Sequence, residues 1–390
     1  MSAPLKLLVS AGEVSGDQHA AALLDALAPR VASLEAVGIG GDGCATRGVR
    51  LLAHQKDLAV VGLVEAIGKI RFARRLLGEL VGAALRQRVD GAVLIDAPDF
   101  NLPLARRLHR AGIPVVFYVS PQVWAWRAGR AKTLARLGKR ILVLFDFEKA
   151  WYEARGLGRA VEWVGHPLVD RAAEELSALP PPGAARPARI VVMPGSRDGE
   201  IRRLLPILRD AVSRLRAARP DLDVVLVRAD SVPLSLLREV VGPALDGWTV
   251  FSGPHLALLS AADVLLVASG TATLEGVLAG IPMVVVYRVH PITYAVGRLL
   301  VKVPHVAMAN IVSDDGSGAR AVPELIQGEA TPERVAAEAA AFLDDPARAA
   351  EARRRLARGR ERLGPPGAAG RAASAVLRVL GVDESAGEAP

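Results

Sequence analysis

The sequence predicts two doubly wound α/β domains, each a parallel sheet covered by helices on both faces, with a helical segment at the C-terminus. Three observations lead to this fold class. Short apolar runs without polar alternation recur along the chain, as in strands that are buried on both faces. Longer amphipathic segments separate these runs, which is the order of successive βαβ units. A proline-rich stretch at residues 178–189, ALPPPGAARPAR, separates two such series.

The two series give the expected strands and domain limits. In the first, the strands are Leu5–Ser10, Ala36–Gly40, Gly91–Ile95, Val115–Val119 and Arg140–Phe145. In the second, they are Ile190–Met193, Val224–Val227, Trp248–Phe251, Val264–Val267 and Met283–Tyr287. We therefore expect domains at residues 1–177 and 190–345, with a ligand cleft between the carboxyl ends of the two sheets. Helices at 346–382 would pack back on the first domain or swap between two subunits.

Composition excludes several classes of protein. With 51% hydrophobic and 23% charged residues, the 390-residue chain is not intrinsically disordered. Cys44 is the only cysteine, which excludes an intrachain disulfide, a Cys-rich zinc site and an iron–sulfur cluster. The seven histidines show no ligand spacing, so we expect no metal site. The N-terminus lacks a signal-peptide pattern, and no uncharged run reaches the roughly 20 residues that a membrane-spanning helix needs.

The net charge of +8 indicates an anionic partner, either nucleic acid, a lipid surface or phosphorylated ligands. Aromatic residues make up only 4%, which disfavours a stacking platform for single-stranded nucleic acid. A general bias toward arginine explains the charge equally well. Residues 63–81 add a more specific signal, because four cations fall beside apolar residues at helical spacing. Such a helix can lie on an anionic leaflet or simply cover a sheet; its predicted membrane contacts are Leu63, Ile67, Ile70, Arg71, Arg74 and Arg75.

The loop SAGEVSGD leaves the first expected strand of the first domain. Gly12 permits a tight backbone turn there. Glu13 and Asp17 place two carboxylates at the carboxyl end of the sheet. The alternative is a plain helix start, because Ser15 and Gln18 have the spacing of a capping box.

Further polar and aromatic residues follow later strands of the first domain. In IDAPDFN, Asp96 comes directly after an apolar strand, where a partly desolvated carboxylate can act as a general base. Asp99 precedes a helix and is more simply its N-cap. Trp124, in VSPQVWAWR, can stack on a sugar or line an acyl pocket, and packing in a corner between domains is the alternative. His166, in VGHP, is a candidate ligand contact.

Two strand-to-helix turns in the second domain have the composition of phosphate sites. In MPGSRDGEI, backbone amides and Arg197 can bind a phosphate, although Ser196 can also be a plain N-cap. The glycine–lysine–serine sequence of a P-loop is missing. In VASGTATLE, small and hydroxyl residues crowd a second such turn, and Glu275 lies within reach of a ribose. The residues of this second turn are Ser269, Gly270, Thr271 and Thr273.

Taken together and in this order, these loops resemble the lipid-A-disaccharide synthase family, glycosyltransferase family 19, of Gram-negative bacteria. The resemblance covers roughly residues 7–340, and its collinear strings are SAGEVSGD, GLVEAIGKI, IDAPDFN, YVSPQVWAWR, VGHPLVD, MPGSR, ASGTATLE, PITY, VAMANIV and VPELIQGEATPE. It implies a GT-B-type fold of two Rossmann-like domains and metal-independent, inverting transfer without a cofactor. It also implies a location on the cytoplasmic face of the inner membrane, and a homodimer by family likeness alone.

The resemblance assigns roles to individual residues. Asp96 matches the essential aspartate of the family, and Arg197 matches its essential arginine. Glu13 and Asp17 match a family loop that faces the cleft, and we expect Glu13 to take part in catalysis. The expected contacts with the acceptor or the cleft are Gly12, Asp17, Asn101, Trp124 and His166. Nucleotide-sugar positions are matched by Glu275, Asn310 and Gln327. The segment 313–321, SDDGSGARA, makes the placement of Gln327 less secure than that of Asp96.

The family's substrates are UDP-2,3-diacylglucosamine and 2,3-diacylglucosamine 1-phosphate (lipid X), and its products are lipid A disaccharide 1-phosphate and UDP. The expected mechanism has Asp96 accept a proton from the acceptor hydroxyl while Arg197 and helix N-termini stabilise the leaving phosphate. Two alternatives stay open from the residues. One is another GT-B-like transferase or a UDP-sugar epimerase, and the other is a non-catalytic nucleotide or RNA binder. Because the arginines are spread over many helices, nucleic acid is not the expected partner.

Overall fold

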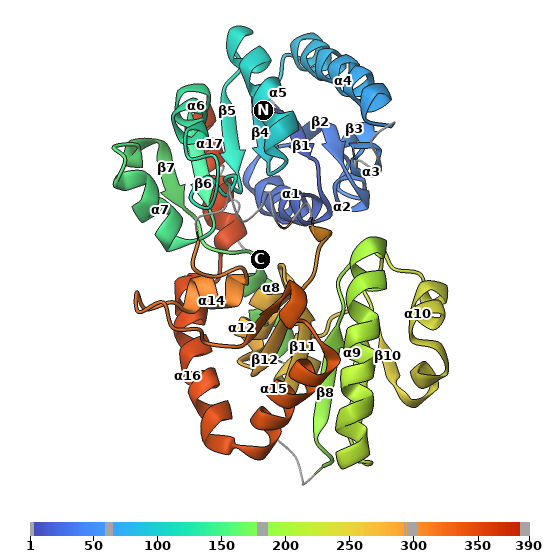
Figure 1. The fold of residues 1–390 in the computed structure, drawn as a ribbon. Helices are drawn as coiled ribbons and strands as arrows, with labels where there is room; N and C mark the ends of the chain where they lie inside the picture. Colours follow the sequence, from blue (N-terminus) through green and yellow to red (C-terminus); the bar gives the residue numbers. More distant parts are fainter. Residues whose placement is uncertain (1–3, 59–64, 178–185, 292–293, 295–302, 383–390) are drawn as a thin grey trace. The chain divides into compact units, whose positions relative to one another are not determined.

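The computed structural model describes residues 4–58, 65–177, 186–291, 294 and 303–382. The chain divides into two compact units (Figure 1). The first combines the residues up to Pro167 with those from Gly364 onward, and the second spans Leu168–Leu363. The first unit is therefore discontinuous in sequence, while the second is a single stretch of chain.

The first unit contains a seven-stranded parallel sheet with the order β3-β2-β1-β4-β5-β6-β7. Its strands are β1 (Leu5–Ala11), β2 (Leu34–Gly40), β3 (Arg50–His54), β4 (Gly91–Ile95), β5 (Val115–Tyr118), β6 (Arg140–Val143) and β7 (Val161–Trp163). The helices are α1 (Val14–Leu27), α2 (Asp42–Ala45), α3 (Gln55–Leu58), α4 (Glu65–Gln87), α5 (Pro98–Arg110), α6 (Arg130–Leu137), α7 (Asp146–Glu153) and α17 (Ala368–Leu380), with short 3-10 turns at Ala28–Arg30 and Gly158–Ala160.

The second unit repeats this topology with a six-stranded parallel sheet, β10-β9-β8-β11-β12-β13. Its strands are β8 (Arg189–Met193), β9 (Asp223–Val227), β10 (Thr249–Phe251), β11 (Val264–Ala268), β12 (Met283–Tyr287) and β13 (Glu324–Ile326). The helices are α8 (Leu168–Ser177), α9 (Asp198–Ala218), α10 (Leu234–Val241), α11 (Leu256–Ser260), α12 (Ala272–Ala279), α14 (Met308–Ser313), α15 (Pro332–Asp344) and α16 (Pro346–Arg362), with 3-10 turns at Gly242–Gly247 and Gln327–Glu329.

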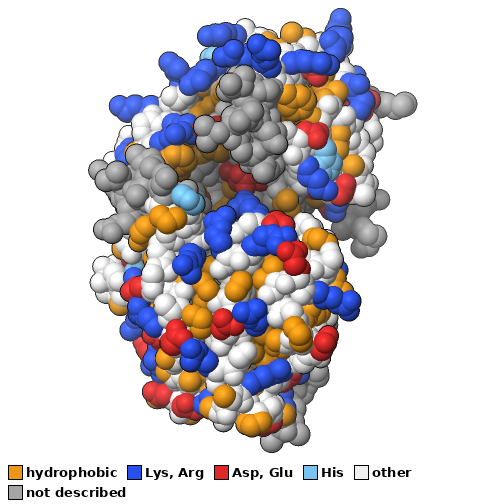
Figure 2. All heavy atoms as spheres, turned by 45° about the vertical axis from the view of Figure 1, so that its right-hand side comes forward, with side chains coloured by type: hydrophobic (Ala, Val, Ile, Leu, Met, Phe, Trp, Pro, Cys, Tyr) orange, Lys and Arg blue, Asp and Glu red, His pale blue; other side chains and the backbone are white. Residues whose placement is uncertain are grey.

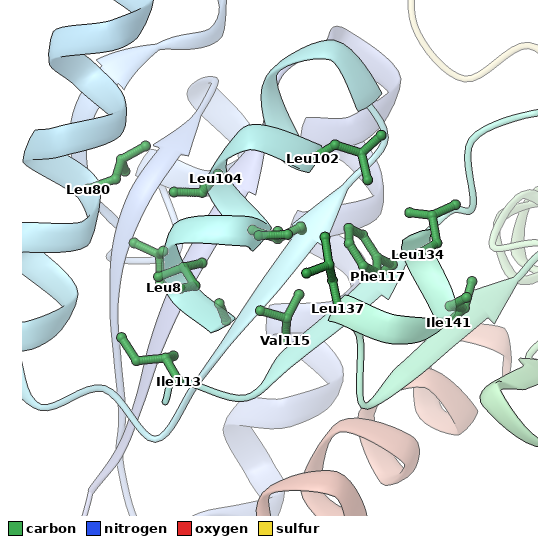
Figure 3. Packing of buried hydrophobic residues seen from close by; sticks show 14 of the residues in the cluster. Leu8, Leu80, Leu102, Leu104, Ile113, Val115, Phe117, Leu134, Leu137 and Ile141 are labelled. Atoms are coloured by element: carbon green, nitrogen blue, oxygen red, sulfur yellow. The ribbon is translucent and has the colours of Figure 1, made fainter. Parts of the chain in front are cut away.

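Each sheet is buried between helices because its strands are apolar. In the first unit, Leu80 of α4, Leu104 of α5 and Leu134 of α6 pack toward Leu8 and Phe117 on one face of the sheet (Figure 3). β4 and β11 are buried along their whole length, which explains why they show no polar alternation. Burying one such aliphatic side chain contributes about 1.5–3 kcal/mol, so the sheets form rigid supports for the loops at their ends.

The predicted fold class is confirmed, and the limits of β4 and β12 are as expected. Three strands were missed, namely β3, β7 and β13, and all three lie at a sheet edge. The domain limits also differ from the expectation. Helix α8 and helix α16 belong to the second unit, and only α17 returns to the first, where it packs against α1. Helix α8 belongs to the second unit because Arg171 and Glu175 bind side-chain and backbone groups there.

Two predicted helix caps are wrong. Helix α1 begins at Val14 with Glu13 at the N-cap, so Ser15 lies inside the helix and does not form the expected capping box. Helix α5 begins after Ala97, and Asp99 lies in its first turn. There Asp99 forms ion pairs with Arg130, at 2.6 Å, and with Arg127, at 3.3 Å, on the surface.

Candidate active site

The loops that carry Glu13, Asp96, Arg197 and Gly270 lie where the strand order of each sheet reverses. In the first sheet this point lies between β1 and β4, whose ends Ala11 and Ile95 are register partners. In the second it lies between β8 and β11, where Met193 is paired with Val267. Ligands of open α/β sheets bind at such a reversal, outside the carboxyl ends of the strands. Each unit therefore has one pair of adjacent loops in the position of a ligand site.

Asp96 lies in a strained turn at the carboxyl end of β4. Its φ is 48°, and that of Ala97 is 42°, both in the left-handed region that non-glycine residues rarely adopt. Each such residue costs of order 1–3 kcal/mol, and this conformation persists only where the surroundings enforce it. The Asp96 N–H donates to the Tyr118 carbonyl oxygen at 3.3 Å. The side chain of Asp96 is half-buried, which suits a carboxylate that must accept a proton from a substrate.

Asn101 ties this turn to the end of β1. Its amide Nδ2 donates to the carbonyl oxygens of Asp96 at 2.8 Å and Ile95 at 3.0 Å, and more weakly to that of Ser10 at 3.4 Å. Its Oδ1 accepts a hydrogen bond from the Ser10 hydroxyl at 2.7 Å. Because Asn101 is only 1% exposed, the expectation that it contacts the acceptor directly is not supported. Asn101 joins the end of β1 to the loop after β4 through buried hydrogen bonds.

Gly12 and Glu13 form the neighbouring loop. A Cβ on Gly12 would lie 2.6 Å from the Cβ of Ala97, so only glycine lets the two loops pack together here. Glu13 is exposed at the N-terminus of α1, where its carboxylate can meet a ligand. The loop that carries Gly12 and Glu13 therefore lies against the turn formed by Asp96 and Ala97.

Asp17 has a structural role instead of the expected cleft contact. It is buried, and its carboxylate accepts hydrogen bonds from the amides of Gly41 at 2.7 Å, Gly43 at 2.9 Å and Cys44 at 3.0 Å. Burial alone would raise the pKa of Asp17, but hydrogen bonds from the Cys44 side chain and these amides outweigh it, and the net pKa is lowered. The carboxylate therefore holds the turn between β2 and α2.

Trp124 belongs to a row of rings along the carboxyl ends of β5, β6 and β7. Its half-buried ring meets Phe147 edge to face at 5.0 Å between centroids. The row continues through Phe145, His166 and His19, and successive ring centroids lie 5.3–5.7 Å apart. Burial lowers the pKa of His19 to about 4, so this imidazole is neutral at pH 7. The row presents Trp124 and Phe147 as partly exposed apolar surfaces on the first unit.

A buried carboxyl that the sequence analysis missed fixes the position of Trp124. Glu148 accepts a hydrogen bond from the Trp124 indole at 3.2 Å and further bonds from the amides of Leu144 and Phe145 at 3.1 and 3.2 Å. Burial raises the pKa of Glu148 to about 7, although these donors partly oppose the shift. Its bonds to Leu144 and Phe145 are local and belong to the start of α7, but its contact with Trp124 joins two loops that are distant in the sequence.

Arg197 is the N-cap residue of α9, in the loop after β8, and its side chain is exposed. The expected cap, Ser196, precedes it, and the Ser196 N–H donates to Glu200 at 3.2 Å. Gly195 has a φ of 110°, and a Cβ there would lie 2.0 Å from the Glu200 carboxylate. Since Glu200 already occupies the Ser196 amide, the guanidinium of Arg197 is the group of this loop that suits an incoming phosphate.

The second loop of this unit follows β11 and leads into α12. Gly270 and Thr271 are exposed, and Ser269 is half-buried. A Cβ on Gly270 would meet nothing within 4 Å, so the protein itself leaves open space above this turn. A glycine that packing does not require is expected where a ligand approaches the backbone closely. Thr273 is different, because it is fully buried and its hydroxyl donates to the Gly270 carbonyl oxygen at 2.8 Å. It supports the turn and does not reach a ligand.

Glu275, in the first turn of α12, forms a charged cluster with Arg171 and His255. It is paired with Arg171 of α8 and accepts a hydrogen bond from His255 Nε2 at 3.1 Å. Burial would raise the pKa of Glu275, but His255 and Arg171 outweigh it and lower the net pKa. Correspondingly, burial would lower the pKa of His255, and Glu275 reverses this and raises it. The carboxylate is therefore ionised and already oriented by two partners.

Asn310 and Gln327 also hold the backbone. Asn310 is fully buried, and its amide binds both the Val322 backbone and the Glu324 carboxylate at 2.8–2.9 Å. The predicted direct contact of Asn310 with a nucleotide sugar is thus not supported. Gln327, with a φ of 53°, pairs its side-chain amide with both backbone groups of Val289 at 2.8 and 3.1 Å. It fixes the chain just beyond β12.

The basic helix α4 has an exposed cationic face. Its buried residues Leu76, Leu77 and Leu80 pack in the core, whereas Phe72 is 38% exposed. Of the predicted membrane contacts, Leu63, Ile67 and Ile70 lie outside the residues whose side chains the structure describes. Lys and Arg side chains gather on the outer surface of the first unit, at the top of Figure 2, and the exposed ones on α4 include Arg71, Arg74 and Arg75. Among the described helices none is long and apolar enough to cross a bilayer.

Within the described residues, no cluster of three histidine, cysteine or acidic side chains has the arrangement of a metal site. A groove of about 390 Å³ lies beside the edge strand β13, lined by Phe342 and four arginines that belong mainly to α15 and α16. None of the predicted site residues lines this groove, so it is separate from the candidate active site.

Two doubly wound units of this topology are the GT-B architecture, which glycosyltransferases and sugar-nucleotide epimerases of known structure share. Solved structures of the same fold include calicheamicin glycosyltransferase CalG4, with a TM-score of 0.59, 16% identity and coverage of 97% of this chain and 99% of that chain. Another is UDP-GlcNAc 2-epimerase from Neisseria meningitidis bound to UDP-GlcNAc, with a TM-score of 0.65, 12% identity and coverage of 96% and 100%. At these identities the likeness shows the fold alone.

Sequence comparisons show the family. The family model described as lipid-A-disaccharide synthetase matches residues 7–379. Lipid-A-disaccharide synthase of Myxococcus xanthus is 42% identical over 395 residues, covering 97% of this chain and 99% of the relative. That of Geobacter sulfurreducens is 40% identical over 380 residues, covering 96% and 97%. The chain belongs to the lipid-A-disaccharide synthase family and is thus a glycosyltransferase of lipid A biosynthesis.

Proposed function

We propose that the protein transfers the sugar of UDP-2,3-diacylglucosamine to the 6-hydroxyl of 2,3-diacylglucosamine 1-phosphate, with inversion at the anomeric carbon and release of UDP. The carboxylate of Asp96 carries this proposal, because it is half-buried in an enforced turn at the strand reversal of the first unit. A carboxylate placed in this way can accept the proton of an attacking hydroxyl. The first unit would accordingly hold the acceptor.

The second unit would hold the donor. Its two loops offer the exposed Arg197 guanidinium and the open turn at Gly270 and Thr271, at the N-terminus of α12. Positive charge and a helix N-terminus favour a pyrophosphate at this place. Glu275 is ionised, is held by His255 and lies in the first turn of α12, from where it would bind a ribose hydroxyl.

In the reaction, the oxygen of the acceptor hydroxyl forms a bond to the anomeric carbon, and Asp96 takes its proton. The bond from the anomeric carbon to the phosphate oxygen breaks, and the electron pair leaves with UDP. Arg197 and the α12 amides stabilise the negative charge that develops on the leaving phosphate. These groups perform the work that a divalent cation performs in other transferases, so we expect transfer without added metal.

Purified protein with both lipid substrates, in the presence of EDTA, tests this proposal. General-base assistance contributes about 10²–10⁴-fold, so Asp96→Ala should lose roughly that much turnover while it stays folded and still binds UDP. Asp96→Asn is the matched variant, because it keeps the size of the side chain and removes its basicity. A near-normal rate for either variant would exclude Asp96 as the base. Loss of product on adding EDTA would exclude metal-independent transfer.

We also propose that the protein is peripheral on the cytoplasmic face of the inner membrane and binds there through α4. Exposed cations beside the exposed Phe72 ring suit an anionic lipid surface. Sedimentation with vesicles should then depend on anionic lipid and fall strongly when Arg71, Arg74 and Arg75 are replaced by serine. The matched control removes the same charge from α16, at the exposed Arg353, Arg354 and Arg358. Equal losses for the two triple variants would exclude a specific role of α4.

A further inference from the structure

The turn that carries Asp96 is enforced by a buried polar network whose members do not themselves reach a substrate. Asp96 and Ala97 are consecutive residues with positive φ, and neither is a glycine. Such a pair relaxes unless its backbone groups are held. Hydrogen bonds from β5 and from the first turn of α5 hold it, and Ser10 of β1 in turn holds Asn101 of that helix.

Hydrogen bonds engage both backbone groups of Asp96, its N–H and its carbonyl oxygen. On one side its N–H donates to the Tyr118 carbonyl oxygen of β5. On the other side its carbonyl oxygen accepts from Asn101 Nδ2 at 2.8 Å. The Ala97 carbonyl oxygen accepts from the Asn101 backbone N–H at 2.9 Å, which begins α5. Asn101 thus binds the strained turn through both its side chain and its backbone.

The backbone carbonyl oxygens determine which way the Asn101 amide faces, and the Ser10 hydroxyl stabilises that orientation. This hydroxyl, fully buried at the end of β1, donates to Asn101 Oδ1 at 2.7 Å. With Oδ1 engaged there, Nδ2 is directed at the backbone carbonyl oxygens, where only a donor is stabilising. Without this hydroxyl the buried Oδ1 of Asn101 loses its hydrogen bond, and the side chain loses its anchor on β1.

We propose that Asn101 and Ser10 are positioning residues of the transfer reaction, which hold the Asp96 carboxylate in place through the backbone of its turn. The inference rests on the proposed function of Asp96 as general base. A displacement of about 1 Å at a reacting group can cost on the order of 10²-fold in rate. Removing the network should therefore lower kcat and leave the KM of both lipid substrates nearly unchanged.

A double-mutant cycle with Asp96 tests this directly. We expect Asn101→Ala to lower kcat by about 10–10²-fold in the otherwise normal protein, with each KM within about 2-fold. In the Asp96→Ala background the same substitution should change the residual rate by less than about 2-fold, because its target is gone. A radiolabelled acceptor makes that residual rate measurable. Equal losses in both backgrounds would overturn the proposal, since a general structural defect acts regardless of Asp96.

Ser10→Ala provides a milder test, and it decides the question if Asn101→Ala does not fold. It should lower kcat by about 3–10-fold and show the same lack of effect in the Asp96→Ala background. Ser120→Ala is the matched control, because it removes another buried hydroxyl of the first unit, one that is bonded to Tyr152 at 2.9 Å. Its kcat should stay normal. If Asp96→Ala itself is nearly fully active, the proposed base is wrong; if only the cycle is additive, the positioning role alone is wrong.

Discussion

Replacing Asp17 with alanine should open the turn after β2 and destabilise the first unit. The carboxylate accepts three backbone hydrogen bonds, from Gly41, Gly43 and Cys44. A hydrogen bond to a charged group contributes about 1.5–3 kcal/mol, and a buried donor that loses its partner costs a similar amount. Two of the three donors are buried, while the Gly43 amide can be hydrated. We therefore expect a loss of about 3–5 kcal/mol in the free energy of local opening.

Cys44 gives a direct assay of this loss. It is the only cysteine of the chain, it is fully buried, and its own amide is one of the Asp17 donors. Its reaction with a thiol reagent under native conditions therefore measures opening of this turn. Because 1.4 kcal/mol corresponds to a factor of ten, Asp17→Ala should accelerate labelling by at least about 100-fold. Guanidinium unfolding should show a lower midpoint as well.

The control for this experiment is Asp17→Asn, which keeps the size of the side chain and one acceptor oxygen. It should give an intermediate labelling rate. The pH dependence provides a second check. The pKa of Asp17 is lower in the folded protein than the usual 3.8 of an aspartate, so its stabilisation is complete above about pH 4 and is lost as the pH falls through the folded-state pKa. Labelling within 2-fold of the normal rate for Asp17→Ala would refute the assigned role.

Three further predictions follow from other contacts of the site. Trp124 fluorescence should titrate with a midpoint near the Glu148 pKa of about 7, and Glu148→Gln should abolish this step. Because the pKa of Glu148 is raised in the folded state, the free energy of unfolding should fall as the pH rises from about 4.5 to 7. The pKa of His255, followed by NMR, should lie above 6.5 and drop in Glu275→Gln; a value that stays unchanged would contradict the pairing. Gly270→Ala should leave the thermal unfolding midpoint unchanged yet weaken UDP binding, and unaltered binding would remove this turn from the donor site.

The fold could be predicted from the sequence because buried parallel strands have a local signature. β4 and β11 are continuous apolar runs, and the residues after them mark the loops of each strand reversal. β7 and β13 have only three residues each and lie at sheet edges, where one side of the strand is unpaired. Such short segments contain too few residues for a periodic pattern, and of the three-residue edge strands only β10 was recognised from the sequence.

The site could be predicted as a set of loops, but not residue by residue. Asp96 and Arg197 have exposed or half-buried side chains at the expected ends of strands. Thr273 and Asn310 occur in the same motifs, yet their side chains point into the protein and bind backbone groups. A motif does not distinguish a residue that touches the ligand from one that supports the loop. Partners more than ten positions away, such as Glu324 for Asn310, decide this, and they are known only from the folded chain.

The return of the chain to its first unit has a consequence for the order of folding during synthesis. Helix α17 packs on α1, and the side chain of Leu380 occupies the space where a Cβ on Gly91 would lie 2.4 Å from it. The ribosome adds about 5–20 residues per second, so this last helix emerges well after the seven strands of its sheet. The second unit, being contiguous, can complete its sheet while the first still exposes the apolar face of α1. The first unit therefore completes its packing only after α17 has been synthesised, and α1 is incompletely covered during that interval.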